Sequence, residues 1–227
     1  MSQVDIPVAS VVDVVFPLEG HSLPREHTQA LAQALGAQLP WLATEPLAGI
    51  HRVKMVAGND SHALLSQRTR LLMRLPRARV AALSALPGQT LDVGGSEVRL
   101  GAPHLRELLP HATLYAYAVA AASDDELIFM ETVASELQSL QVRAHTVCGK
   151  RQHLVVAGRT LDTFSLMLHG LSPQHSLLLQ EQGVGGHRLL GCGTHRGRGD
   201  PHPPGGDCAE GPEVRPADRR SVRLDAR

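Results

Sequence analysis

The chain has 227 residues, 43% of them hydrophobic and 19% charged, which is enough for one large or two small folded domains. Because 22 Lys and Arg residues balance 22 Asp and Glu residues, a uniformly basic surface is excluded, and any contact with nucleic acid needs a local basic patch. Aromatic residues make up only 3% of the chain, which argues against a broad base-stacking platform.

The first 109 residues predict one α+β unit. An apolar run over 9–16 predicts a buried strand, and Pro24 suits the start of a helix that Pro40 ends. Strands are expected within 50–56 and 66–75, followed by a short helix over 77–86. Gly94-Gly95, between strands over 90–93 and 97–100, predicts a tight hairpin that closes the unit.

Residues 110–195 predict a second unit with the same order of elements. A strand over 113–120 precedes a long helix that starts near residues 123–126 and reaches about 140. Strands over 143–147 and 153–156 flank a predicted turn at 149–151, and another strand spans 164–169. A helix then runs from Ser172-Pro173 to about 182, before a last strand near Leu189. The predicted fold is therefore α+β, with two tandem ferredoxin-like (RRM-like) βαββαβ units.

The composition changes after Gly193. Residues 196–227 contain no aromatic residue and few large apolar ones, so this segment cannot bury enough surface to order itself. We expect a disordered C-terminal tail over 196–227 and no final strand from Thr194 to Arg198. A native basic extension and a change of reading frame after about Gly193 both account for this composition.

The cysteines, Cys148, Cys192 and Cys208, are far apart and form no Cys-x-x-Cys pair. This spacing disfavours a disulfide framework or a zinc site, and no metal or other cofactor is predicted. No run of about eighteen apolar residues occurs, and the first residues lack the basic segment of a signal peptide. We therefore expect a cytoplasmic protein without a membrane segment.

The stretch from Gly183 to Gly193 contains five glycines in eleven residues and favours a loop whose backbone contacts a ligand. It does not fit the Rossmann fingerprint, because Arg188 occupies the last glycine position and a helix precedes it. It does not fit a Walker loop either, because Cys192-Gly193 stands where Lys and Ser or Thr are needed. A nucleotide-dependent small-molecule enzyme is therefore disfavoured.

Four blocks of the sequence carry a family resemblance. They are Val12–Phe16 with Gly20 and Leu23-Pro24-x-x-His27; Leu39-Pro40-Trp41-Leu42 with Pro46–His51; Phe164–His169 with Leu171-Ser172-Pro173; and Gly183–Gly193 (GVGGHRLLGCG). Together they resemble the CRISPR repeat-processing endoribonucleases, the Cas-six family. The resemblance spans roughly residues 10–193.

The resemblance implies a metal-independent endoribonuclease that cleaves CRISPR precursor transcripts within the repeat and yields mature guide RNAs. Its expected partners are the precursor repeat and the guide RNA, with other Cas effector-complex subunits as further candidates and no membrane. The alternative is a non-cleaving subunit of the same fold that binds the repeat RNA.

Metal-free RNA cleavage needs a base near the ribose 2′-hydroxyl, an acid near the leaving 5′-oxygen, and cations around the phosphate. It yields a 2′,3′-cyclic phosphate and a 5′-hydroxyl. His27, in the first turns of the predicted helix, is the first candidate for the base, because a helix N-terminus favours the neutral imidazole. A histidine packed at the core edge beside Leu31 and Leu35 is the alternative. His21 is the competing candidate, and Lys54 is expected to reach the same site.

Arg188 is the predicted phosphate clamp of the glycine loop, with a solvated loop arginine as the alternative. Lys150 and Arg151, at a predicted hairpin turn, suit phosphate contact, although exposed turns are often basic for solubility alone. The predicted RNA-binding residues are Gly183, Gly185, Gly186, His187, Arg188, Gly191, Gly193, Lys150 and Arg151.

Overall fold

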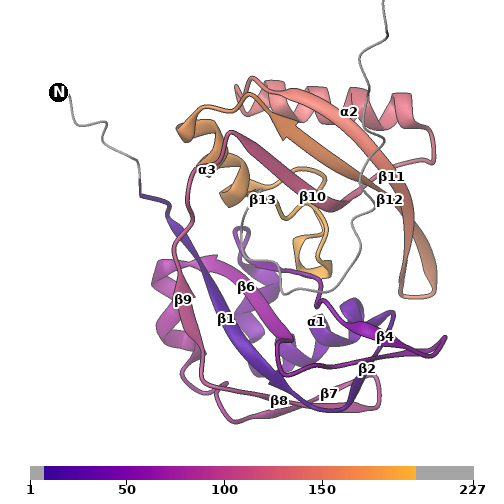
Figure 1. Cartoon of the computed structure of the whole chain (residues 1–227). Helices are drawn as coiled ribbons and strands as arrows, with labels where there is room; N and C mark the ends of the chain where they lie inside the picture. The colour runs from indigo at the N-terminus through magenta and orange to yellow at the C-terminus, as the bar shows by residue number, and fades with distance from the viewer. Residues whose placement is uncertain (1–7, 198–227) are drawn as a thin grey trace, which may run out of the picture.

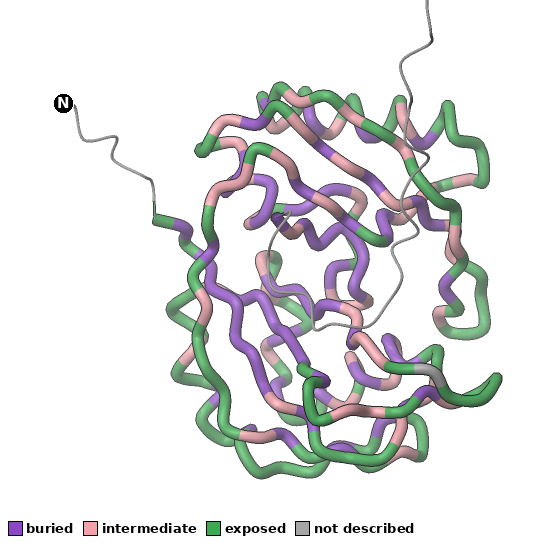
Figure 2. Tube along the Cα trace, viewed as in Figure 1, coloured by how far each residue is buried: buried purple, intermediate pink, exposed green. Residues whose placement is uncertain are grey.

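The computed structural model describes residues 8–197, so the expected tail lies outside the described residues from position 198 onward. The chain has a mixed α+β fold built from an N-terminal half (8–109) and a C-terminal half (110–197), which lie one above the other in Figure 1. Figure 2 shows buried segments along the central strands of both halves.

The elements of the N-terminal half, with η for 3₁₀ helices, are β1 (Val11–Glu19), β2 (Ser22–Pro24), α1 (His27–Gln38), η1 (Pro40–Thr44), β3 (Gly49–Ile50), β4 (Val56–Gly58), β5 (His62–Leu64), β6 (Arg70–Pro76), η2 (Arg77–Leu83), β7 (Thr90–Val93), β8 (Ser96–Leu100) and β9 (His104–Arg106).

β1 is the centre of the N-terminal sheet, whose order is β3-β6-β1-β8-β7. One side of β1 pairs with β6 along most of its length. On the other side of β1, β9 pairs with residues 13–15 and β8 pairs with Leu18 and Glu19 at the end of the strand. Leu31 and Leu35 of α1 pack into the same core as the buried residues of β1 and β6. The predicted hairpin over 90–100 is confirmed, but the sequence did not predict β9.

The start of α1 differs from the prediction in a way that concerns the site. Pro24 lies in β2, where it is paired with His62, and α1 begins at His27. The chain leaves the helix at Pro40, as predicted. The predicted helix over 77–86 is the 3₁₀ helix η2.

The elements of the C-terminal half are β10 (Thr113–Ala120), α2 (Glu126–Ser139), β11 (His145–Val156), β12 (Arg159–His169), α3 (Pro173–Gln182), η3 (Arg188–Leu190) and β13 (Arg196–Gly197).

Side-chain caps fix both helices of the C-terminal half. The Asp125 carboxylate accepts hydrogen bonds from the backbone N–H groups of Leu127 and Ile128, and the Ser172 hydroxyl accepts one from His175. The predicted strand over 113–120 and the helix from 173 to 182 are confirmed. The sheet has the order β11-β12-β10-β13.

Two predictions for the C-terminal half are wrong. The segment 149–151 is not a turn, because β11 is one strand with an irregular register between Cys148 and Arg151, and the chain reverses after Val156. Leu189 lies in η3, and the last strand is β13, which pairs with Leu114 and Tyr115 of β10. Arg196 and Gly197 therefore supply the strand that the sequence was expected to lack. Across 8–197, no helix has both the length and the apolar composition needed to cross a bilayer.

Candidate functional site

A cavity of about 250 Å³ lies between the two halves, and we call it the central cavity. Its walls come from the start of α1 and the segment after β3 on one side, and from β10, β11 and the C-terminal segment on the other. Its lining residues are His27, His51, Arg52, Val53, Lys54, Met55, Tyr117, Gln152, Gly191, Thr194 and Arg196. Among the described residues, 8–197, the lining thus contains the cationic side chains of Arg52, Lys54 and Arg196 and no carboxylate.

His27 lies at the first position of α1 and is 1% exposed. Its Nδ1 is 3.1 Å from the Pro24 carbonyl oxygen, which can only accept, so Nδ1 carries the proton of the neutral ring. Its Nε2 accepts a long hydrogen bond of 3.3 Å from the Val53 backbone N–H. Burial lowers the pKa of His27, and the charge of Arg52 lowers it further, against the hydrogen bond to Pro24. The ring is therefore neutral, with its basic nitrogen directed at the cavity wall.

His51 follows β3 and is 3% exposed. Arg196 of β13 donates from Nε to His51 Nδ1 at 2.9 Å, so a residue of the C-terminal strand holds a histidine of the N-terminal half. Burial holds the pKa of His51 well below its ordinary value, and the charges of Arg196, Arg74, Arg106 and Arg188 lower it further. His51 is therefore a second neutral histidine in the lining.

Lys54 lies in irregular chain between β3 and β4, where a strand was predicted. Its Nζ is 5.1 Å from the centre of the Tyr117 ring, a cation–π arrangement that joins the two halves across the cavity. Lys54 and His27 thus line one cavity. His21, by contrast, is exposed in the bend between β1 and β2 and does not line it.

Arg188, the predicted phosphate clamp of the glycine loop, lies inside the protein. It is 8% exposed, and its Nη1 donates to the carbonyl oxygens of Glu181 and Gln182 at the end of α3. Burial lowers its pKa to about 10, and the charge of Arg74 contributes. The Arg188 side chain thus binds the last carbonyl groups of α3. The sequence alone does not show whether an arginine in such a loop binds helix carbonyls or a phosphate.

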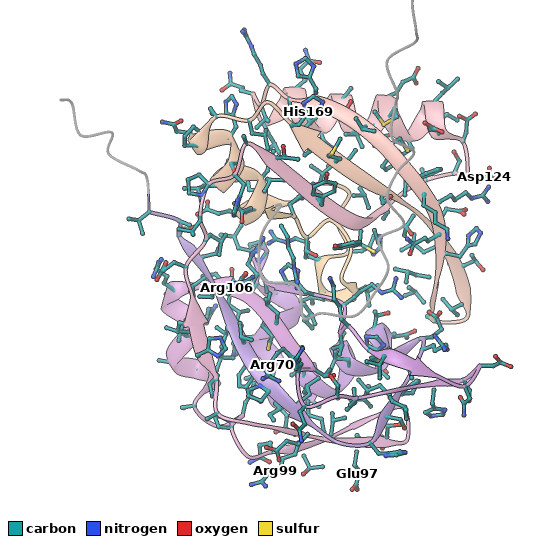
Figure 3. The ribbon with its side chains drawn as sticks, in the orientation of Figure 1. Arg70, Glu97, Arg99, Arg106, Asp124 and His169 are labelled. Carbon is teal, nitrogen blue, oxygen red and sulfur yellow. The ribbon has the colours of Figure 1, made fainter. Side chains whose placement is uncertain are left out.

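Arg74 joins the two halves and is fully buried. It donates to both carboxylate oxygens of Asp13, at 2.7 and 3.1 Å, and to the carbonyl oxygens of Gln180 and His195, each at 2.9 Å. Arg106, labelled in Figure 3, donates to the same carboxylate at 2.8 Å. Burial raises the pKa of Asp13, but the two arginines outweigh this and lower it. The bonds of Arg74 fix α3 and the segment around His195 against the N-terminal half.

Several backbone N–H groups of the glycine loop are hydrogen-bonded within the protein. Gly185 N–H donates to the Glu136 carboxylate at 2.8 Å, and Gly193 N–H donates to the Ala118 carbonyl at 2.7 Å. Gly191 has φ +78°, and a Cβ there would lie 2.7 Å from Cγ of Arg52. The loop is therefore bonded to α2 and β10, and Gly191 permits close packing against Arg52 at the cavity. Of the predicted loop residues, Gly191 lines the cavity, whereas Gly183, Gly185, Gly186, His187, Arg188 and Gly193 do not.

Lys150 and Arg151 are exposed, as predicted, but lie in the middle of β11 and outside the lining. Arg151 is paired with Asp124, which Figure 3 labels at the edge of the C-terminal half, at 3.1 Å, and with Asp162 at 3.3 Å. These carboxylates offset the charge of Arg151 and weaken the case for phosphate binding there.

Sequence reasoning missed most of the lining. His51 and Arg52 lie three and two positions before Lys54, and His51 ends one of the blocks that carry the resemblance, so a signal for them existed. Arg196 was assigned to the tail because the residues around it are polar. Tyr117 lies in β10 and Gln152 in β11, where no local sequence pattern marks them as site residues. Only the packing of the two halves brings them to the cavity.

Comparisons with known proteins agree with this fold. The family model described as Cas6 Crispr matches residues 12–197. The CRISPR-associated endonuclease Cas6 of Myxococcus xanthus (strain DK1622) is 36% identical over 183 residues, which cover 80% of this chain and 79% of that protein.

Solved structures give the same picture at the level of the fold. A CRISPR-associated protein Cas6 superposes with a TM-score of 0.62 at 9% identity, covering 83% of this chain and 99% of the other. A Cas6-related protein of Pyrococcus furiosus superposes with a TM-score of 0.58 at 12% identity, covering 84% of this chain and 100% of the other. From the family match and the Myxococcus relative, the chain belongs to the Cas6 family of CRISPR-associated endoribonucleases.

Proposed function

We propose that this chain cleaves CRISPR precursor transcripts within the repeat, without a metal ion, and that the central cavity holds the scissile phosphate. The 2′-hydroxyl attacks the adjacent phosphorus as the bond to the 5′-oxygen breaks, giving a 2′,3′-cyclic phosphate and a 5′-hydroxyl. The observation that carries this proposal is that neutral His27 lines the cavity together with Arg52, Lys54 and Arg196, and that residues 8–197 contribute no carboxylate to this lining. Such a lining attracts a polyanion and lets an uncharged base work beside it.

His27 is the proposed general base. Its Nδ1–H is held by Pro24, which leaves the Nε2 lone pair as the basic site. That lone pair must exchange the Val53 N–H for the ribose hydroxyl, and the length of the existing bond, 3.3 Å, makes this exchange inexpensive. Because burial lowers the pKa of His27 below its ordinary value, the ring is mostly unprotonated at neutral pH and can act as a base.

Lys54 is the proposed cation nearest the reacting phosphate, with Arg52 and Arg196 around it. A Lys ammonium is a compact donor that can stabilise charge on a phosphate oxygen or protonate the leaving 5′-oxygen. Tyr117 holds that ammonium from the other half of the molecule at 5.1 Å. The site is therefore complete only when both halves contribute.

The strand orders support a finer description of the fold. β9-β1-β6-β3 in the N-terminal half and β13-β10-β12-β11 in the C-terminal half have the same antiparallel arrangement, with α1 or α2 after the first strand. We assign two tandem ferredoxin-like units, the first within 1–109 and the second over 110–197 rather than 110–195, because β13 (Arg196–Gly197) completes it. The proposed partners are the precursor repeat, the mature guide RNA and other Cas effector-complex subunits.

One observation favours a non-cleaving subunit that binds the repeat RNA. Both ring nitrogens of His27 have partners, and the side chain is 1% exposed. A histidine held in this way serves the fold equally well without catalysis.

Single-turnover cleavage of a synthetic repeat RNA from the source genome in EDTA tests the proposal. His27→Asn keeps a side-chain N–H for the Pro24 carbonyl but has no basic nitrogen, so the rate should fall by about 10²- to 10⁴-fold with little change in affinity. His21→Ala should cleave at the wild-type rate. Cleavage by His27→Asn at the wild-type rate would exclude His27 as the base, and a requirement for Mg²⁺ would exclude the metal-free reaction.

A further inference from the structure

The contact between His51 and Arg196 fixes the protonation of a buried imidazole. Arginine can only donate, so His51 Nδ1 must accept the bond of 2.9 Å from Arg196 Nε. A neutral imidazole has one donor and one acceptor, and the proton of His51 is therefore on Nε2. A doubly protonated ring would direct a second N–H at Arg196 and lose this contact.

The Nε2–H of His51 has no acceptor within residues 8–197, although the residue is only 3% exposed. A buried donor without an acceptor is destabilising, and most such groups in folded proteins have a partner. His51 lines the central cavity together with His27 and Lys54, so a molecule in that cavity can supply the missing acceptor.

The surroundings of His51 select the kind of acceptor. Arg196, Arg74, Arg106 and Arg188 all act on it electrostatically, and they outnumber the buried Asp13 carboxylate. A positive field of this kind favours an anionic oxygen over a neutral hydroxyl or carbonyl. In RNA the anionic oxygens are the non-bridging phosphate oxygens.

We propose that His51 binds a non-bridging oxygen of the scissile phosphate through Nε2–H, and that Arg196 is the positioning residue that holds the ring in the donating tautomer. This inference rests on the proposed function, because it places the phosphate in the central cavity. It gives the two histidines different tasks: His27 accepts a proton, and His51 remains a neutral donor to the phosphate. It also gives the C-terminal strand a role in the site.

Phosphorothioate substitution tests the contact directly. Sulfur accepts hydrogen bonds less well than oxygen, so the wild-type chain should cleave the two diastereomers at the scissile phosphate at different rates. His51→Phe fills the same space without a ring nitrogen. It should slow cleavage of the all-oxygen repeat RNA by about 10- to 100-fold and bring the ratio of the diastereomer rates close to one. If both rates fall while their ratio is unchanged, His51 has only a structural role and the inference is wrong.

His51→Gln and Arg196→Met provide further tests. The His51→Gln variant should preserve much of the diastereomer ratio, because the amide N–H of the introduced side chain can still donate. Arg196→Met should reduce the rate, and in the His51→Phe background the same substitution should cost clearly less than it costs in the wild type, since part of its effect acts through His51. A double variant slower by the full Arg196→Met factor would overturn the positioning role.

Binding separates this inference from the proposed function. A repeat RNA with a 2′-deoxyribose at the cleavage position binds without reacting, and His51→Phe should weaken its binding by about 10-fold relative to the wild type. If the wild-type chain binds but never cleaves the unmodified RNA, the proposed function fails and this binding comparison still decides on His51. Equal affinities would overturn the inference.

Discussion

The buried histidines should make the stability of this protein strongly pH-dependent, and His195 allows the size to be worked out. His195 is fully buried, its Nδ1 lies 3.0 Å from the Gly193 carbonyl oxygen, and its Nε2 has no partner in the described part of the chain. Burial lowers its pKa to about 4; the Gly193 bond opposes this, and the charges of Arg74 and Arg188 add to it. The charged ring would be an unpaired cation among other cations.

The sign and magnitude follow from proton linkage. Above pH 6.5 the ring is neutral in the folded and unfolded states, so its contribution to stability is complete. As the pH falls from 6.5 to about 4, the unfolded chain binds a proton that the folded chain does not, and stability falls by up to about 1.4 kcal/mol per pH unit. The total loss from His195 is therefore about 3 kcal/mol. The lowered pKa values of His51 and His27 act in the same direction.

Urea unfolding between pH 7 and pH 4, followed by circular dichroism, measures this loss. His195→Asn keeps a side-chain N–H for the Gly193 carbonyl but does not titrate. The difference in unfolding free energy between wild type and His195→Asn should therefore shrink by about 3 kcal/mol from pH 7 to pH 4. His104→Asn, at an exposed position, should run parallel to the wild type. Parallel curves for wild type and His195→Asn would refute the reasoning.

Substitutions at Arg188, Lys54 and Arg151 separate structural cations from RNA-binding ones, and substitutions at Tyr117 test the ring beside Lys54. Arg188→Met should lower the melting temperature by several degrees, because the Glu181 and Gln182 carbonyl groups lose a buried donor. It should leave the salt dependence of RNA binding unchanged, and a reduced slope of log affinity against log salt would restore the phosphate-clamp role. Lys54→Ala should reduce the slope of log affinity against log salt by about one unit, and Arg151→Ala, whose charge is offset by carboxylates, should change it less; equal changes would contradict this assignment. Tyr117→Phe keeps the ring beneath the Lys54 ammonium and should cleave repeat RNA normally, whereas Tyr117→Leu should be slower; equal rates would exclude a role for the ring.

Local patterns predicted most elements and failed where a glycine was ambiguous. The Gly94-Gly95 hairpin and the Ser172-Pro173 helix start have strong local signals, and both are present. Gly149 looked like a turn residue, but it lies in a strand opposite Ser165, next to the irregular register of β11. A glycine within a strand often marks a bulge, and only the partner strand distinguishes a bulge from a turn.

The candidate site was predictable only in part, because exposure of a long side chain is a property of the folded molecule. His27 and Lys54 were chosen from their positions in the chain, and both line the central cavity. Arg188 has an equally suggestive neighbourhood in sequence, but its guanidinium is directed inward to the end of α3. His51 and Arg196 are 145 positions apart, and no local pattern indicates that they are hydrogen-bonded.

Truncation at the end of the chain gives a sharp test of the site. Arg196 and Gly197 belong to the tail expected over 196–227, but in the structure they form β13, and Arg196 lines the central cavity. A chain that ends after Gly197 keeps Arg196, its bond to His51 and both pairings of β13 with β10. A chain that ends after His195 keeps the bond of Arg74 to the His195 carbonyl group but loses Arg196 and Gly197.

The chain that ends after Gly197 should therefore cleave repeat RNA at close to the full-length rate. The chain that ends after His195 should cleave it at least about 10-fold more slowly. Truncation also places a new terminal carboxylate close to the site. As a control, Arg196→Ala in the chain that ends after Gly197 should reproduce most of the loss in cleavage rate seen for the chain that ends after His195. If both truncated chains cleave equally fast, β13 serves only the fold. If both are inactive while the full chain cleaves, the reaction needs residues beyond 197, and the cavity described between the two halves is not the complete site.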